Sequence, residues 1–453
     1  MENKKEVSSL ERDVSKFKEE FLKKTEGKEI KIVSHFDTDG ISSAVLMMKT
    51  LRELDKKFSL EIIKNLEEEH IKNLSENSED QIILFLDLAS GSIKHIKKYG
   101  LDEVFIIDHH EMDPNESIPE NLNIISPEFS KKEKISASGL TYMFCKSIYS
   151  EAKEFAKLGV LGMVGDRLDK EMCKINHEML KDGEIRKKRG LLIYPATRPL
   201  NRTLEYSSSP FIPGVTGNPE GVRDLLREAG IPKTKRGYKS LLELEEEEMS
   251  NLVTAIMLRN PKAQHQEIIG DIHLLKFFNK QEDARELSAI INACSRLGKP
   301  HTAIRFCMEI PSAKKEAESI YAQYKQRIIS GLRYISEMDK IENKGFIIIN
   351  AQDKVKDTIV GTLASILSSS SIYEEGTTII AMAHNENGKI KISARNVNSQ
   401  GRNLREVMSS ATSRFGGEHG GHQAAAGALI NKEHEKDFIE HLRKQLEIER
   451  VKI

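Results

Sequence analysis

Acidic residues and histidines gather in two short segments that each follow a run of apolar residues. The first is His-Phe-Asp-Thr-Asp-Gly at residues 35–40, and the second is Asp-His-His at residues 108–110. Carboxylates and imidazoles at the end of a buried strand are costly to bury without partners. A divalent cation or a bound phosphate would supply such a partner, so both segments are candidates for metal chemistry.

In the first segment, His35, Asp37 and Asp39 alternate with other residues. In an extended chain this spacing of two aims all three side chains at the same face. Gly40 would let the backbone turn, and a helix starting at Ile41 would direct its first N–H groups towards a phosphate. Taken alone, the segment also fits an ordinary corner between a strand and a helix.

Two single aspartates occupy similar positions elsewhere in the sequence. Asp87 ends the apolar run at residues 81–86, and Asp166 follows an apolar stretch at residues 155–164 and Gly165. Asp87 is poorly placed for solubility alone, although it would also serve as a turn or helix-capping residue. Four acidic corners in separate elements therefore stand out along the first 170 residues.

The chemistry of these side chains favours hard divalent cations. Carboxylate oxygens with some imidazole suit Mn²⁺ or Mg²⁺, and they argue against zinc bound by thiolates. Several carboxylates that converge repel one another unless cations lie between them. Two divalent ions about 3.5–4 Å apart would remove this repulsion and would serve in-line displacement at phosphorus. We therefore expect a two-metal centre that holds Mn²⁺ or Mg²⁺.

Short apolar strands that alternate with helices must position these residues. Strands at 30–36, 81–86 and 103–107, with a helix at 41–54, predict a doubly wound α/β domain whose buried parallel sheet carries functional groups at its carboxyl edge. We expect residues 1–27, which precede the first strand in the sequence, to form an exposed, charged helix.

The remaining sequence predicts further parts. We expect a catalytic domain at 1–184, a mostly helical inserted domain at 185–310, a long charged linker helix at 311–341 and a smaller α/β domain at 342–453. The insert opens with a basic, Pro-, Ser- and Gly-containing stretch. The last domain begins with apolar strands at 345–349, 378–382 and 389–393.

A glycine-rich segment lies in this last domain, at residues 416–427. Closely spaced glycines let backbone N–H groups approach an anion, and His422 can donate a hydrogen bond to it. The three alanines at 424–426 predict the start of a tightly packed helix. For His419, simple exposure to solvent is as good an explanation as a role in binding an anion.

With these motifs in view, the chain resembles the DHH phosphoesterase superfamily. Residues 35–40, Asp87, residues 108–110 and Asp166 match the family's four N-terminal motifs in order, across about residues 30–170. Residues 416–427 resemble the GGHxxAAG signature of the DHH-associated domain. Any one motif is modest evidence, but their combination in order is highly specific.

The resemblance implies a role for each matching residue. It implies metal ligation by Asp37, Asp39, Asp87, His109 and Asp166, with Asp87 bridging both ions. His35 is a further ligand candidate; RecJ-like members share its position, whereas manganese pyrophosphatases place a histidine four residues before the aspartate.

The same resemblance implies roles outside the direct ligand set. Asp108 would orient the imidazoles, and His110 would contact the scissile phosphate. In the C-terminal domain, Gly420, Gly421 and His422 would bind the substrate phosphate. Arg395 resembles a further phosphate contact, with a surface arginine as the alternative.

The long insert resembles that of archaeal RecJ-like proteins. This implies a single-strand exonuclease, 5′ to 3′ on DNA, although some archaeal relatives act on RNA from the 3′ end. Basic clusters in the insert would neutralise backbone phosphates, or they would simply be solvated surface; they are Arg186–Arg189, Arg198, Arg202, Lys233, Lys235, Arg236 and Lys239.

Two other functions stay open. One is a phosphodiesterase for short oligonucleotides or cyclic dinucleotides. The other is a replisome scaffold that bridges a helicase and GINS, as some DHH relatives with degraded motifs do. The expected partners are single-stranded DNA or RNA, with GINS or a replicative helicase as further candidates. The sequence leaves polarity, product length, metal identity and oligomeric state open.

Composition sets outer bounds on these functions. The 453 residues carry a formal net charge of −1, so any nucleic-acid site must be a local patch or a metal-centred groove. The four cysteines form no CxxC pair, which argues against a zinc knuckle or redox motif. The N-terminus is charged and no apolar run approaches the roughly 20 residues of a membrane helix. We expect a cytoplasmic protein without membrane partners.

Overall fold

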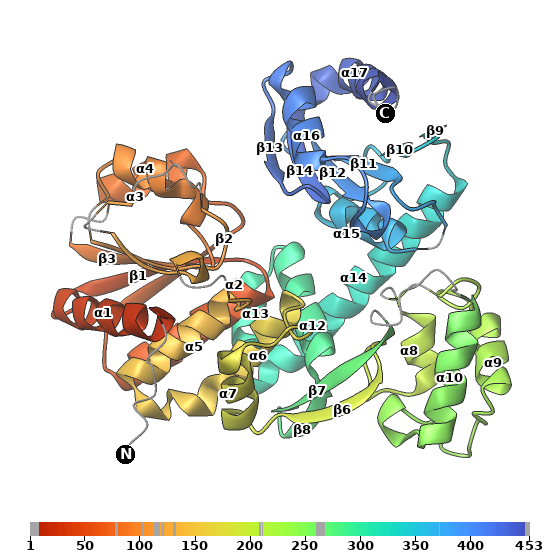
Figure 1. The fold of residues 1–453 in the computed structure, drawn as a ribbon, viewed down its shortest axis with the longest axis horizontal. Helices are drawn as coiled ribbons and strands as arrows, with labels where there is room; N and C mark the ends of the chain where they lie inside the picture. Colours follow the sequence, from red (N-terminus) through yellow and green to blue (C-terminus); the bar gives the residue numbers. More distant parts are fainter. Residues whose placement is uncertain are drawn as a thin grey trace. The chain divides into compact units, whose positions relative to one another are not determined.

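The polypeptide forms two units, each built from two separate stretches of sequence (Figure 1). Unit 1 comprises Met1–Arg189 and Asp271–Tyr321, and unit 2 comprises Gly190–Gly270 and Ala322–Ile453. The computed structural model describes residues 9–448 except 78–79, 102, 113–117, 120–121, 130–132, 208–209, 211, 260–267 and 371.

The centre of unit 1 is a five-stranded sheet of order β2-β1-β3-β4-β5 in which all neighbours are parallel. Its strands are β1 (Glu29–His35), β2 (Phe58–Ile63), β3 (Gln81–Leu86), β4 (Val104–Ile107) and β5 (Asn123–Ile125). The predicted doubly wound parallel sheet is confirmed. The strand order reverses between β1 and β3, and ligands bind at such switch points beyond the carboxyl ends of the strands.

Helices cover both faces of this sheet (Figure 1). Helices α3 (Glu68–Asn77) and α4 (Ile93–Lys98) pack on one face through a cluster that includes Val33, Phe85 and Ile106. The opposite face is covered by α1 (Ser9–Lys24), α2 (Thr38–Glu53) and α5 (Ala137–Ile148). Burial on both faces explains why the strands are almost continuously apolar.

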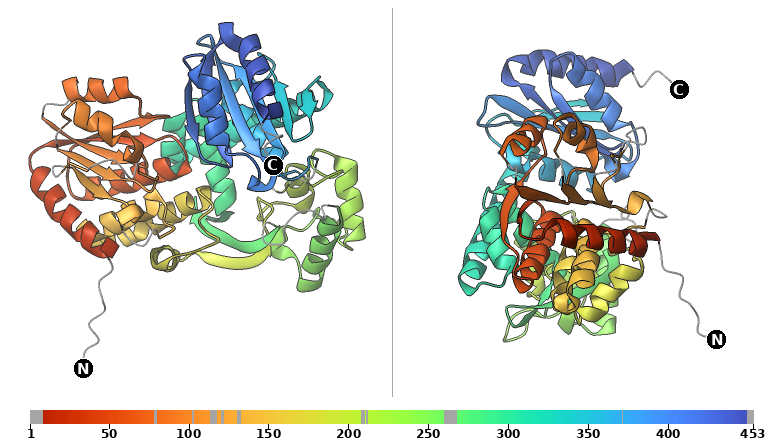
Figure 2. Two further views of the ribbon diagram at one scale, coloured as in Figure 1. Left: turned by 45° about the horizontal axis from the view of Figure 1, so that its top comes forward. Right: turned by 90° about the vertical axis from the view of Figure 1, so that its left-hand side faces the viewer.

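The prediction that the N-terminal helix is exposed is wrong. In both views of Figure 2, α1 (red) lies along one face of the unit 1 sheet. Its Leu10, Val14, Phe17 and Phe21 are buried, and their spacing of three and four residues places them on one side of the helix. The charged residues between them hide this apolar stripe in the sequence.

The second stretch of unit 1 differs from the predicted insert at 185–310. Residues from Asp271 onward belong to unit 1, where α12 (Ala284–Arg296) packs against α2 and α6 (Ala156–Gly165). Leu287, Ile291 and Cys294 of α12 are buried. This return to unit 1 depends on long-range packing that no local pattern records. The other elements of the stretch are β7 (Ile269–Phe277), β8 (Lys280–Asp283) and α13 (Pro300–Cys307).

Unit 2 combines a helical part with a mixed sheet. The helical part contains α8 (Leu200–Glu205), α9 (Pro219–Glu228) and α10 (Glu246–Arg259). The sheet has the order β13-β14-β12-β11-β10-β9, and its β10–β11 pair is parallel whereas the other pairs are antiparallel. Its strands are β9 (Ile341–Asn343), β10 (Phe346–Asn350), β11 (Thr378–His384), β12 (Lys389–Asn396), β13 (Glu418–Gly421) and β14 (Ala425–Asn431).

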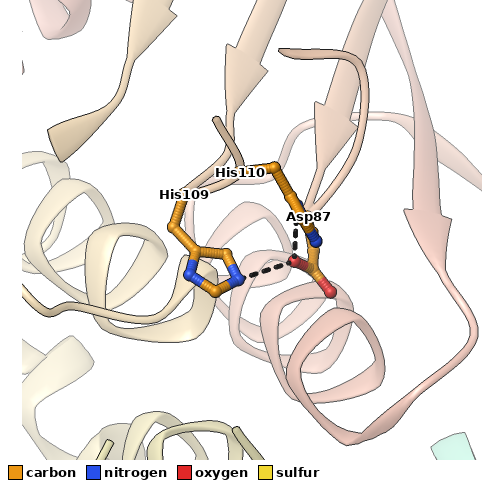
Figure 3. Close-up of side chains that lie close together, drawn as sticks. All are labelled: Asp87, His109 and His110. Atoms are coloured by element: carbon orange, nitrogen blue, oxygen red, sulfur yellow. Dashed lines mark ion pairs between the residues drawn. The ribbon is translucent and has the colours of Figure 1, made fainter. Parts of the chain in front are cut away.

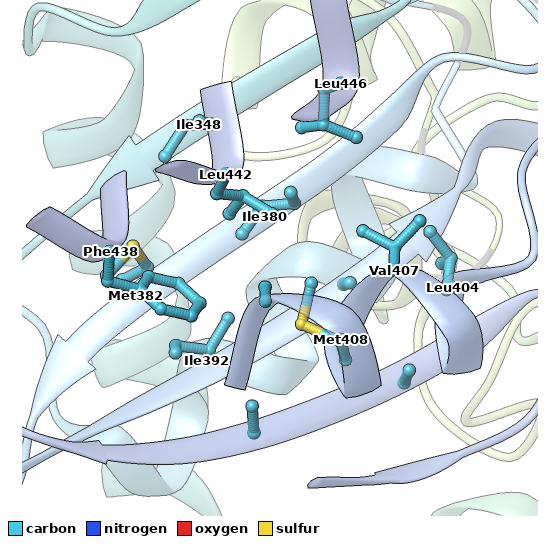
Figure 4. Close-up of a cluster of buried hydrophobic side chains, with 14 of the residues drawn as sticks. Ile348, Ile380, Met382, Ile392, Leu404, Val407, Met408, Phe438, Leu442 and Leu446 are labelled. Carbon is cyan, nitrogen blue, oxygen red and sulfur yellow. The ribbon is translucent and has the colours of Figure 1, made fainter. Parts of the chain in front are cut away.

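One face of this sheet packs against α16 (Leu404–Ser413) and α17 (Glu435–Ile448) in an apolar cluster (Figure 4). The prediction that the alanines at 424–426 start a helix is wrong, because β14 begins at Ala425 and pairs with β12. Ala426, Ala428 and Ile430 alternate with more exposed residues and contribute to the cluster. In the sequence this spacing of two residues indicates a strand, but the small alanines made the alternation hard to recognise.

A long helix, α14 (Pro311–Glu337), starts in unit 1 and continues into unit 2 after Tyr321. It covers most of the segment that the sequence predicts as a linker helix. Within the described part of the chain, no helix combines the length and apolarity needed to cross a bilayer.

Phe21→Ala tests the packing of α1. Phe21 is fully buried and meets the Phe105 and Phe144 rings edge-on, with centroids 5.2 and 5.0 Å away. We expect the free energy of unfolding to fall by about 3–5 kcal/mol, measured by urea denaturation. The neighbouring Leu22 is 37% exposed, so Leu22→Ala should cost less than about 1 kcal/mol. Equal losses in the two variants would contradict the packing described for α1.

Candidate metal centre

The first predicted segment spans the junction between β1 and α2. His35 ends β1, and Asp37 caps α2 by accepting a hydrogen bond from the Gly40 N–H. His35 Nδ1 lies 3.1 Å from Asp37 Oδ2 and 3.2 Å from Asp87 Oδ2. Asp39 lies in the first turn of α2. The prediction that all three side chains share one extended face is therefore wrong for Asp39, because the helix begins earlier than Ile41.

Gly40 is required for space and not for an unusual turn. A Cβ atom at this position would lie 2.3 Å from the His35 carbonyl oxygen. The glycine thus lets the first turn of α2 approach the end of β1 closely. It brings Asp39 beneath the strand edge from which His35 projects.

Asp39 is fully buried and is held by the N-terminus of α5. The Ala137 and Ser138 N–H groups donate to its two carboxylate oxygens at 2.7 and 3.0 Å. The N-terminal end of a helix favours a negative charge. Sequence analysis did not identify this support, because nothing in the sequence near residues 136–138 pairs it with Asp39.

Gly162 of α6 makes room for the same carboxylate. A Cβ atom there would lie 2.1 Å from Asp39 Oδ1 and 2.1 Å from Ser138 Oγ. The run of small and apolar residues before Asp166 contains this glycine, but only the packing of α6 against α2 and α5 reveals its purpose. Gly162 is a positioning residue that sequence analysis missed.

Asp87 belongs to two of the candidate ligand groups, and Figure 3 shows it beside His109 and His110. It follows β3, its side chain is 1% exposed, and its backbone is left-handed, with φ 59°. Oδ2 faces His35, while Oδ1 lies 3.5 Å from His109 Nε2 and 3.7 Å from His110 Nδ1. Within the described residues Oδ1 has no hydrogen-bond partner. Its two oxygens therefore face two different sets of side chains, and Oδ1 meets its imidazoles only as long ion pairs, without the hydrogen bond that a buried polar atom usually has.

The histidine pair follows β4. His109 Nε2 lies 3.2 Å from Asp166 Oδ2 and 3.8 Å from Asp39 Oδ2. Asp108 is buried beneath the pair, accepts a hydrogen bond from the Ser90 N–H at 2.9 Å, and lies 2.7 Å from His110 Nδ1. This contact raises the pKa of His110 to about 9. Although burial opposes it, the same contact lowers the pKa of Asp108.

Three overlapping groups of side chains each offer ligand atoms within 4.8 Å of one another. They are His35 with Asp37 and Asp87, Asp87 with His109 and His110, and Asp39 with His109 and Asp166. The structure thus brings together all six predicted ligands. Oxygen donors with imidazole, around a buried carboxylate oxygen that has no hydrogen bond among the described residues, fit hard divalent cations.

The carboxylates at this edge destabilise one another's charges. Burial, with the neighbouring Asp87 charge, raises the pKa of Asp39 to about 6. Burial, with the Asp39 charge, raises the pKa of Asp166 to about 6. Burial and the Asp37 charge also raise the pKa of Asp87. A cation would relieve this repulsion, which is the physical argument for metal binding here.

Protonated histidines offset part of this carboxylate charge. Burial lowers their pKa values, but hydrogen bonds and charges from the carboxylates outweigh it. Asp37 and Asp87 raise the pKa of His35 to about 11. Asp166 and Asp87 raise the pKa of His109 to about 12. Each positively charged imidazole therefore neutralises carboxylates that a bound cation would also neutralise.

One side of the constellation is open to solvent. The side chains of Asp37 and His110 are 32% and 49% exposed, whereas those of Asp87 and Asp108 are 1% exposed. The buried carboxylates of Asp87 and Asp108 thus form the floor of the site, and the more exposed Asp37 and His110 form its rim. A phosphate could approach the rim while the floor stays shielded from water.

The predicted substrate-binding residues of the C-terminal domain lie together in unit 2. Gly420 and Gly421 end β13 and His422 follows them, and all three are exposed. The His422 N–H donates to the Ala425 carbonyl at 2.8 Å, which closes a turn into β14. Arg395 of β12 is in register with Ala425, so it lies beside this turn. Its Nε donates to Ser365 Oγ at 3.0 Å.

Comparison with known domains divides the chain in three. Residues 29–163 match the DHH family N-terminal domain, residues 194–268 the DHH-CID domain and residues 343–447 the DHHA1 domain. An uncharacterized protein of Methanocaldococcus jannaschii is 26% identical over 426 residues, which cover 91% of this chain and 92% of that protein.

Solved structures share the fold at low sequence identity. RecJ from Thermus thermophilus, in complex with Mn²⁺, superposes with a TM-score of 0.60 at 17% identity, covering 98% of this chain but only 55% of that protein. Another exonuclease RecJ, bound to manganese, gives 0.59 at 16% identity and coverages of 97% and 94%. CDC45 from Entamoeba histolytica gives 0.68 at 12% identity and coverages of 97% and 98%.

Gly162→Ala tests how Asp39 is positioned. The added methyl group must displace the carboxylate, so we expect Mn²⁺ affinity to fall by about 10- to 100-fold, measured by isothermal titration calorimetry. Gly159→Ala, one turn earlier in α6, is the control, since its Cβ would meet the flexible Met179 side chain. Similar Mn²⁺ affinities of the two variants would contradict the role given to Gly162.

Cation binding should release protons. Because His35 and His109 have pKa values near 11 and 12, both are protonated at neutral pH, and only neutral imidazole binds a metal. Mn²⁺ affinity should therefore rise with pH from about 6 to 9. It should fall further below the pKa of about 6 of Asp39 and Asp166, where these carboxylates protonate. Calorimetry in buffers of different ionisation enthalpy measures the release, and a pH-independent affinity would contradict this account.

Proposed function

Because the chain carries a DHH family N-terminal domain together with DHH-CID and DHHA1 domains, we propose that it is a metal-dependent exonuclease of the RecJ type. It hydrolyses phosphodiester bonds from the end of a single strand, 5′ to 3′ on DNA, with RNA as a second substrate. The observation that carries this proposal is Asp87, whose two oxygens face two groups of potential ligands. The site residues and their roles below belong to the proposal.

The proposed ligands are His35, Asp37, Asp39, Asp87, His109 and Asp166. Two divalent cations, Mn²⁺ in preference to Mg²⁺, would activate water and neutralise charge on the phosphoryl oxygens. Asp87 supplies one oxygen to each of the two groups to which it belongs, and Asp39 is fixed by α5 so that its carboxylate cannot rotate away. The structure-based argument for cations is the mutual repulsion of the buried carboxylates.

His110 and Asp108 act on the substrate side of this centre. His110 is the more exposed histidine of the pair, and its raised pKa keeps it positively charged at neutral pH. We assign it to the scissile phosphate, which a cationic donor would bind strongly. Asp108 fixes the ring through Nδ1 and so leaves Nε2 free to face the phosphate.

Unit 2 would hold the strand. The turn at 420–422 offers the exposed His422 imidazole to a phosphate, and Arg395 lies beside it. In the helical part, Lys233, Lys235 and Arg236 are exposed around a tight turn closed between Thr234 and Gly237. Positive charge on such a turn suits sequence-independent contact with a phosphate backbone.

A second candidate is a replisome scaffold that binds GINS or a helicase. The observation in its favour is the likeness to CDC45, whose chain is covered over 98% of its length. A scaffold has no need for six converging potential ligands that include several buried carboxylates, so we favour the enzyme. A phosphodiesterase for short oligonucleotides or cyclic dinucleotides is the alternative enzymatic function.

End-labelled DNA, RNA and dinucleotides, each incubated with the protein and Mn²⁺, test these functions directly. We expect stepwise shortening of single strands, and labels at either end reveal the polarity. Asp87→Asn should reduce the rate by about 10³-fold or more, because the shared ligand has no substitute. Asparagine also tolerates the left-handed backbone at this position.

Asp55→Asn is the matched control for Asp87→Asn, since Asp55 is an exposed aspartate of the same unit with φ 50°. It should keep full activity. Cleavage of dinucleotides alone would exclude the exonuclease, and inertness towards every substrate would favour the scaffold. Full activity of Asp87→Asn would exclude the proposed bridging role.

His422→Ala tests the strand-binding role of unit 2. Loss of one hydrogen bond to a phosphate should raise KM about tenfold with kcat within about twofold. His419→Ala is the control, because His419 Nδ1 lies 3.0 Å from Thr412 Oγ1 and is held within the unit. An unchanged KM in steady-state kinetics of His422→Ala would remove His422 from the substrate site.

A further inference from the structure

The loop that carries Asp37 and Asp39 is bonded to a helix far downstream in the sequence. The Thr38 N–H donates to Asn292 Oδ1 at 3.1 Å, and Thr38 Oγ1 donates to the Ser288 carbonyl at 3.0 Å. Ser288 Oγ in turn donates to Thr38 Oγ1 at 3.1 Å. Asn292 and Ser288 are one helical turn apart on α12, so a single face of α12 holds Thr38.

These bonds act on a backbone group that the helix cannot satisfy itself. Thr38 is the first residue of α2, and the first N–H groups of a helix have no partner within it. Thr38 is also 1% exposed, which excludes water as a ready substitute. Asn292 therefore supplies an acceptor that the buried loop would otherwise lack.

Thr38 connects residues of two different ligand groups. Asp37 belongs to the group with His35 and Asp87, whereas Asp39 belongs to the group with His109 and Asp166. The backbone of Thr38 thus sets the distance between the two groups.

Close packing restricts Thr38 from a third side. A Cβ atom at Gly165 would lie 3.0 Å from Thr38 Cβ and 3.3 Å from Ser288 Oγ. Gly165 directly precedes Asp166, another predicted ligand. The ends of α2 and α6 therefore meet α12 at one tightly packed point.

We propose that Asn292 and Ser288 are positioning residues that set the separation between the two cation-binding groups. This inference rests on the proposed function, because it concerns the same centre. It assigns part of the metal centre to α12, which follows the DHH-CID domain in the sequence. Loading with two cations then depends on a segment outside residues 29–163, which match the DHH N-terminal domain.

Replacement of Asn292 in the full chain tests the inference. Asn292→Leu keeps the approximate side-chain size but lacks the oxygen that accepts the Thr38 N–H, whereas Asn292→Asp keeps an acceptor oxygen. We expect Asn292→Leu to weaken Mn²⁺ binding about tenfold, the effect of losing one hydrogen bond, and to alter the electron paramagnetic resonance signal of two coupled Mn²⁺ ions. Asn292→Asp should restore both properties. Ser295→Ala on the same helix is the control, as no hydrogen bond of its hydroxyl is found among the described residues.

Wild-type affinity and an unchanged coupled spectrum in Asn292→Leu would overturn the inference. Thermal unfolding in EDTA shows whether this variant folds. If it does not, Thr38→Val and Thr38→Ser decide in the same way, since only serine keeps the hydroxyl that bonds to Ser288. Mn²⁺ binding by the wild type without cleavage of any strand would overturn the proposed function alone. Absence of Mn²⁺ binding by the wild type would overturn both.

Discussion

Buried carboxylates at one edge of a parallel sheet are the constraint on which the rest of unit 1 depends. Asp39, Asp87 and Asp108 are all but excluded from water, where an uncompensated charge is costly. Asp39 is compensated by the first N–H groups of α5, and Asp108 by His110 and the Ser90 N–H. Asp87 retains an oxygen without a hydrogen bond among the described residues. This missing hydrogen bond, within a cluster of buried carboxylates, is the strongest physical sign of a cation.

The doubly wound architecture brings these groups to one place. The strand order reverses between β1 and β3, so the loops after these strands diverge to opposite faces and leave space between them. His35 ends β1 and Asp87 directly follows β3, and their side chains meet at this edge, 3.2 Å apart. The histidine pair reaches the same edge from β4, and Asp166 reaches it from the end of α6. Glycines at 40, 162 and 165 permit the close approach of the helices that complete the site.

The fold alone does not decide activity. Solved structures that share it include RecJ exonucleases as well as CDC45, and function lies in the residues placed on a fold. In this chain the acidic corners and the histidine pair are all present and lie together. Their mutual repulsion would be a cost without benefit in a purely structural protein, which is why the geometry favours a hydrolytic role.

Sequence by itself determined the candidate ligand residues, their order and the parallel sheet, because long apolar runs ending in acidic residues are local patterns. Tertiary structure decided what supports them. The apolar stripe of α1, the strand at β14 and the return of α12 to unit 1 all arise from packing between distant segments. Asp39 reaches its group of potential ligands from the first turn of a helix, because α2 starts at Thr38. The N-terminus of α5 supplies the hydrogen-bond donors that hold its carboxylate. Local patterns indicate which residues are costly to bury. Only the folded chain shows which distant groups form the hydrogen bonds and ion pairs that stabilise those residues.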